Sequence, residues 1–94
     1  MNIGFLVLDF VAPFCNSLKD KRMIVRSLRD KLTKRFNVAF AEVGEQDKYQ
    51  RILIALVTIA NTPERVHEVL DQAQAFAEAN AKGAELLSAE REML

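Results

Sequence analysis

The chain has 94 residues, half of them hydrophobic and 28% charged, and its 13 basic and 13 acidic residues give a formal net charge of zero. This length fits one small domain with a single core, and the composition excludes a disordered or collagen-like chain. A single cysteine excludes an intrachain disulfide, and the apolar opening stretch is interrupted by Asp9 and is too short to cross a bilayer. We therefore expect a cytoplasmic protein with one domain over residues 1–94.

The first quarter of the chain predicts a strand followed by a helix. Residues 3–11 are rich in branched and aromatic side chains, which is typical of a strand. Ser17 precedes Asp20 by three residues, the spacing of a capping box, and this predicts a helix that runs to about Arg35. The apolar stripe with helical spacing is Leu18, Val25, Leu28 and Leu32, with Ile24 at its margin.

A hairpin and a second helix come next. Residues 36–43 alternate in part and are separated by turn-forming residues from the apolar run 49–60, so the two segments predict a β-hairpin. Thr62 followed by Pro63 predicts a helix start, because threonine caps free amides and proline lacks a donor that this position does not need. The apolar spacing across residues 66–77 predicts the helix itself.

The last segment completes a recognisable order of elements. Residues 86–93 predict an edge strand, whose charges would discourage edge-to-edge aggregation. With right-handed crossovers, the order β-α-β-β-α-β predicts an α+β fold of the ferredoxin-like, split-βαβ kind. Its four-stranded antiparallel sheet carries both helices on one face, and its first and third strands are central.

Both central strands carry apolar side chains on both of their faces. Because the helices cover only one face of the sheet, the other apolar face is left uncovered. One phase combines Ile3, Phe5 and Val7 with Ile52, Ile54 and Leu56. The other combines Leu6, Leu8 and Phe10 with Leu53, Val57 and Ile59. Soluble monomers rarely expose such a patch, and covering each large side chain is worth about 1.5–3 kcal/mol. We predict a homo-oligomer packed through the sheet, with an interface at Leu53, Leu56, Val57 and Ile59.

Two other uses of that face compete with self-association. An RNA-recognition sheet stacks bases on aromatic side chains, but the central strand RILIALVTIA contains none. This disfavours RNA binding on the sheet. A protein or a small apolar ligand bound at the same face remains an open alternative.

The segment from Ser17 to Phe36 holds eight lysines and arginines and two aspartates. Four of the basic residues recur three or four positions apart and form one stripe that is suited to phosphates: Lys19, Arg22, Arg26 and Arg29. The predicted nucleic-acid-binding residues are Lys19, Lys21, Arg22, Arg26 and Arg29. In the alternative interpretation the stripe is solvated or faces acidic side chains of the second helix, namely Glu64, Glu68, Asp71 and Glu78. Such exposed pairs contribute about 0–1 kcal/mol each.

Residues that could do chemistry are few. Cys15 precedes a helix start, where a thiol pKa can be lowered, but no base is apparent nearby. Together with the single histidine, His67, it makes no plausible zinc site. Three carboxylates, Glu42, Glu45 and Asp47, surround the hairpin turn without the spacing of a calcium loop. We expect no cofactor, no metal site and no enzymatic activity.

Several segments together resemble the YlxP-like family of small bacterial proteins, a domain of unknown function. They are SLKDKRMIVRSL, RFNVAFAEV, QDKYQR and the tail ELLSAERE, and they span nearly the whole chain. The resemblance implies a ferredoxin-like fold. It also implies a link to translation, since relatives are often encoded beside initiation and ribosome-maturation genes.

The resemblance bears on individual residues as well. Lys19, Lys21 and Arg22 fall on the family motif, whereas Asn16 and Tyr49 stand where relatives often carry histidine and tryptophan. These departures weaken any catalytic role for a histidine at the helix start. We expect a non-enzymatic protein that contacts structured RNA or a ribosomal particle through its basic helix. The alternative is an oligomeric structural or regulatory module that binds a protein or a small apolar ligand at the sheet face.

Overall fold

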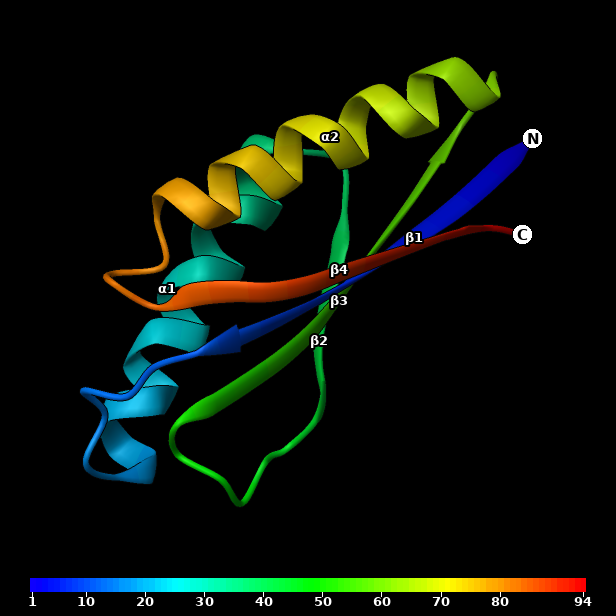
Figure 1. Ribbon diagram of the computed structural model, residues 1–94. Helices are drawn as coiled ribbons and strands as arrows, with labels where there is room; N and C mark the ends of the chain where they lie inside the picture. The colour runs from blue at the N-terminus through cyan, green and yellow to red at the C-terminus, as the bar shows by residue number, and fades with distance from the viewer.

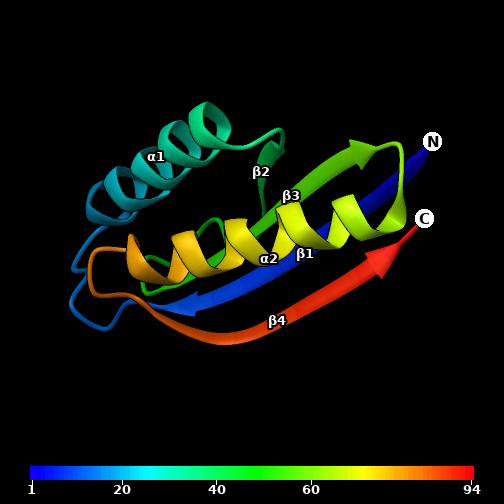
Figure 2. The same ribbon diagram turned by 90° about the horizontal axis from the view of Figure 1, so that it is seen from above.

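Four antiparallel strands and two helices follow one another in the predicted order, as the computed structural model of residues 1–94 shows (Figure 1). The elements are β1 (Asn2–Val11), α1 (Leu18–Arg35), β2 (Ala39–Gly44), β3 (Arg51–Ala60), α2 (Pro63–Ala79) and β4 (Glu85–Met93). The sheet order is β2-β3-β1-β4, so β1 and β3 are central. Both helices lie on the same face of the sheet, with α1 toward the β2 side and α2 over β1 (Figure 2). The predicted ferredoxin-like fold is confirmed.

Both helices begin where their capping residues predict. The Ser17 hydroxyl accepts a hydrogen bond from the Asp20 amide at 3.1 Å, and the Asp20 carboxylate accepts one from the Asn16 amide at 3.0 Å. In α2 the Thr62 hydroxyl accepts from the Arg65 amide at 3.2 Å, directly before Pro63. These bonds satisfy amides that a helix start otherwise leaves unpaired. Neither helix combines the length and apolar character needed to cross a membrane.

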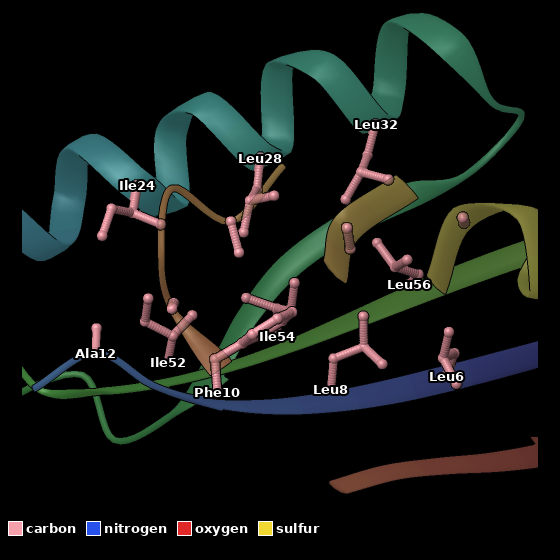
Figure 3. Close-up of a cluster of buried hydrophobic side chains, with 14 of the residues drawn as sticks. Leu6, Leu8, Phe10, Ala12, Ile24, Leu28, Leu32, Ile52, Ile54 and Leu56 are labelled. Carbon is pink, nitrogen blue, oxygen red and sulfur yellow. The ribbon is translucent and has the colours of Figure 1, made fainter. Parts of the chain in front are cut away.

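The core lies between the helices and one face of the two central strands, and Figure 3 shows side chains of α1 pointing down onto those of the sheet. The fully buried strand residues are Leu6, Leu8 and Phe10 of β1 and Ile52, Ile54 and Leu56 of β3. The prediction therefore grouped the strand residues wrongly, because it put the odd-numbered residues of β1 on the same face as the even-numbered residues of β3. In the β1–β3 register Leu6 lies opposite Leu56 and Leu8 opposite Ile54, so even-numbered residues of both strands share the helix-covered face. The residues Ile3, Phe5 and Val7 lie on the other face with Leu53, Val57 and Ile59.

The buried stripe of α1 also differs from the prediction. Its buried residues are Lys21, Ile24, Leu28 and Leu32. Leu18 and Val25 are only partly buried at its flanks. The buried stripe therefore runs through Lys21 and Ile24. A prediction from apolar spacing does not place a lysine at a buried position, so it missed Lys21.

Candidate functional site

The outward side of α1 presents the predicted basic stripe to solvent. Lys19, Arg22, Arg26 and Arg29 are all exposed. Arg29 pairs only with its neighbour Asp30, at 3.2 Å, and the other three form no ion pair. These charges are therefore available to an anionic ligand.

The three arginines of this stripe line one groove between α1 and the edge strand β2. The groove has a volume of about 250 Å³ and is lined by Arg22, Val25, Arg26 and Arg29 of α1 and by Phe40, Ala41 and Glu42 of β2. We call it the arginine groove. It combines guanidinium groups on its helical wall with apolar side chains from both elements. Because guanidinium groups bind phosphate through paired hydrogen bonds, this lining suits a ligand that carries phosphate groups.

The acidic side chains of α2 do not neutralise the stripe. Glu68 pairs with Arg65 on its own helix, and Asp71 pairs with Arg91 of β4 at 2.7 Å. The contact between the helices is of another kind, since the Arg35 guanidinium lies 5.0 Å from the centre of the Phe76 ring. Glu64 and Glu78 form no ion pair, so none of the four acidic residues of α2 pairs with the basic stripe of α1.

Lys21 is removed from the predicted nucleic-acid-binding set, because its side chain is only 2% exposed. Its ammonium contacts three acceptors: the Glu42 carboxylate at 2.9 Å, the Lys48 carbonyl oxygen at 2.9 Å and the Glu45 carbonyl oxygen. An ammonium has three donors, so this geometry uses all of them. Lys21 thus fixes the turn between β2 and β3 against α1 and cannot reach a phosphate in solvent.

Charge is distributed very unevenly along the chain. Residues 18–35 contain eight basic and two acidic residues, a net charge of 8 − 2 = +6. The rest contains 13 − 8 = 5 basic and 13 − 2 = 11 acidic residues, a net charge of −6. A polyanion is attracted to α1 and repelled by the remaining surface, so this field favours one orientation of approach.

The residues predicted for self-association separate into two groups. Leu56 is fully buried beneath the helices, so its assignment to an interface is wrong. The β1–β3 register places it with the core because Leu6 lies opposite. Leu53, Val57 and Ile59 lie on the face without helices, where Val57 is 40% and Ile59 47% exposed.

The two residues considered for chemistry lie in different surroundings. Cys15 is completely buried. Burial raises the pKa of its thiol, the negative charge of Asp20 raises that pKa further, and the positive charge of Lys21 lowers it in part. His67 contacts Arg91, with 3.1 Å between Nδ1 and Nη1. No three potential metal ligands of the His, Cys, Asp and Glu kinds gather at one place.

Cys15 should consequently resist thiol reagents in the native protein. At pH 7.5 we expect modification at least about 100-fold slower than in the denaturant-unfolded chain, because reaction requires local opening and a thiolate. The raised pKa favours the neutral thiol in the folded state. Burial of the neutral Cys15 thiol therefore contributes fully to stability below the pKa that this thiol has in the unfolded chain. That contribution is lost as pH rises through the pKa of the thiol in the folded protein. Absorbance-monitored modification checks this, and rapid labelling of folded protein at neutral pH would contradict it.

Comparison with known proteins places the chain in a family. Residues 3–91 match the model of a family described as a protein of unknown function, DUF503. The chain belongs to the DUF503 family. This DUF503 chain is 27% identical over 74 residues to the uncharacterized protein YlxP of Bacillus subtilis (strain 168), covering 79% of this chain and 80% of that protein. The predicted resemblance to the YlxP-like family is confirmed.

A solved structure resembles this DUF503 protein in its fold. It is SnoaB, a cofactor-independent oxygenase from Streptomyces nogalater, which matches with a TM-score of 0.56 over 99% of this chain and 90% of that one. The two sequences are 11% identical. This likeness supports the ferredoxin-like arrangement of strands and helices alone.

Proposed function

We propose that this DUF503 protein is a non-enzymatic cytoplasmic protein that binds structured RNA or a ribosomal particle through α1. The observation that carries the proposal is the arginine groove. Arg22, Arg26 and Arg29 converge on one groove, and none of them pairs with an acidic residue of another element.

The dimensions of the stripe fit a nucleic-acid strand. Lys19 and Arg29 are ten residues apart on α1, which corresponds to about 15 Å along a helix axis. Four cationic side chains over that length can contact successive phosphates of one strand. Binding of this kind reads backbone and shape more than base sequence.

Glu42 is the one carboxylate in the arginine groove, and its charge is already compensated. Its Oε2 lies 2.9 Å from the buried Lys21 ammonium. The carboxylate is also only 23% exposed, so it faces the interior more than the groove opening. Three guanidinium groups therefore outweigh it in the electrostatics of the groove.

The test is a matched pair of triple variants. Arg22→Ala/Arg26→Ala/Arg29→Ala removes the groove charges, and Lys34→Ala/Lys48→Ala/Arg65→Ala removes the same charge from exposed positions outside the groove. We expect the first to weaken binding to ribosomal RNA by about 100-fold or more, because a hydrogen bond to a charged group contributes about 1.5–3 kcal/mol. The second should change it by less than about fivefold. Fluorescence anisotropy with labelled ribosomal RNA fragments measures both.

Equal losses in the two variants would mean that net charge, and not the groove, controls binding. Unchanged binding in the groove variant would remove the arginines from the interface altogether.

A second candidate function uses the sheet instead. A shallow groove of about 340 Å³ lies at the end of the β2–β3 pair and is lined by Asn37, Val38, Ala39, Val57, Thr58 and Ile59. Its exposed apolar side chains favour a structural or regulatory module that binds a protein or a small apolar ligand there. In that case Arg22, Arg26 and Arg29 are solvated, and cells that carry the triple alanine variant grow like cells that carry the wild-type protein.

A further inference from the structure

The face of the sheet that carries no helix is apolar across its two central strands. Its residues are Ile3, Phe5 and Val7 of β1 and Leu53, Val57 and Ile59 of β3, and we call it the open sheet face. The helices lie only on the opposite face (Figures 1 and 2). Val57 and Ile59 are exposed and the other four residues are only partly buried, and no helix of this chain lies over them, although they are as apolar as the core.

We propose that a second copy of this chain covers the open sheet face, so that two sheets pack against each other in a homodimer. This inference does not rest on RNA binding, because α1 lies on the opposite face of the sheet. Sheets pack face to face about 10 Å apart when their inward side chains are apolar and interdigitate. The odd-numbered residues of β1 and β3 provide such a surface.

The available area is sufficient for a stable dimer. The four strands have 10, 6, 10 and 9 residues, and with about 4.8 Å between strands and about 3.3 Å per residue along them they give a face of roughly 550 Å² per copy. Two such faces bury roughly 1,100 Å² in total, which is above the roughly 1,000 Å² that a biological interface should clear. Because the side chains make the face uneven, the accessible surface that it buries is larger than this projected area.

The charges on the face permit it to meet its own copy. A two-fold interface brings the same patch onto itself, so an uncompensated charge near its centre would repel its counterpart. The charged residues that β1 and β3 place on this face are Asp9 and Arg51, toward one end of the strands, and they neutralise each other with 2.6 Å between Oδ2 and Nη2.

The acidic residues of this face lie at its margin. Glu90 and Glu92 are opposite Val7 and Phe5 on the edge strand β4, and both are exposed. At the rim of a dimer they can stay in water. They also make the face unsuited to an anionic lipid surface, which favours a basic rim.

Sedimentation of the full chain between about 1 and 100 µM tests the proposal. We expect a mass twice the 10.6 kDa of one chain. Val57→Asp and Ile59→Asp should each weaken the dimer by about 100-fold, because each places two carboxylates in an apolar interface. Val57→Thr preserves the side-chain shape and strand preference and should weaken it by about tenfold.

Met23→Asp is the matched control, since Met23 is an apolar residue on α1 with 59% exposure and lies away from this face. It should remain dimeric, as should the triple arginine variant. Circular dichroism checks that each variant is folded. If an aspartate variant does not fold, the sedimentation mass of the wild-type protein still tests the proposal. A wild-type monomer at 100 µM, or a dimer that survives both folded aspartate variants, would overturn the proposal.

Discussion

Replacing Lys21 by methionine is expected to lower the free energy of unfolding by about 2–3 kcal/mol. The substitution leaves the Glu42 carboxylate and the carbonyl oxygens of Glu45 and Lys48 without the ammonium they share. Removing one partner of a fully buried ion pair costs about 3–5 kcal/mol, and we expect a smaller loss here because the Glu42 side chain is partly exposed. Small domains have a stability of only about 5–15 kcal/mol, so the loss is substantial.

Denaturant unfolding followed by circular dichroism measures this effect. Lys31→Met, at an exposed position of the same helix, is the control and should change stability by less than about 0.5 kcal/mol. Adding Glu42→Gln to Lys21→Met should restore part of the loss, because the unpaired charge is then removed. A loss below about 1 kcal/mol in Lys21→Met would show that the turn is held by other contacts.

Replacing Gly4 by valine is expected to cost about 2–3 kcal/mol of stability. A Cβ atom at this position would lie 2.6 Å from Val66 Cγ1 and 3.0 Å from Met93 Sδ. Met93 can move aside, but Val66 is β-branched and held in one rotamer by α2, so the helix itself must shift. The strand preference of valine returns at most about 1 kcal/mol, which does not offset the overpacking.

A double-mutant cycle identifies the cause of this loss. Val66→Ala alone destabilises by opening a cavity, but in combination with Gly4→Val the new side chain fills that space. The double variant should therefore be at least about 1 kcal/mol more stable than the sum of the two single effects predicts. Simple additivity in thermal and denaturant unfolding would mean that α2 does not approach β1 as closely as the structure shows.

The fold could be predicted because its local signals agree with one another. The capping residues Ser17 and Thr62 mark the helix starts, and the order of elements leaves few topologies. The assignment of side chains to the two faces could not be predicted in the same way. It depends on whether even-numbered residues of β1 lie opposite even-numbered or odd-numbered residues of β3. The register pairs Leu6 with Leu56, and it is set by tertiary packing between strands 50 residues apart.

The candidate site was predictable only in part, for a similar reason. Helical spacing identifies Arg22, Arg26 and Arg29 as one stripe. The sequence does not show that β2 supplies the second wall of the groove, since that contact is tertiary. Lys21 was misassigned because a charged residue is normally exposed, and its buried position depends on carbonyl groups that only the folded turn brings to it.

The salt dependence of binding to purified ribosomal subunits tests the central claim most directly. If Arg22, Arg26 and Arg29 contact phosphates, log K should fall linearly with log salt, at about 0.7–0.9 per phosphate contacted. The slope of the triple alanine variant should then be shallower by about 2–3. The control variant with the same net charge should keep the wild-type slope. Identical slopes for wild type and groove variant, or no binding at low salt, would contradict an RNA-binding role for α1.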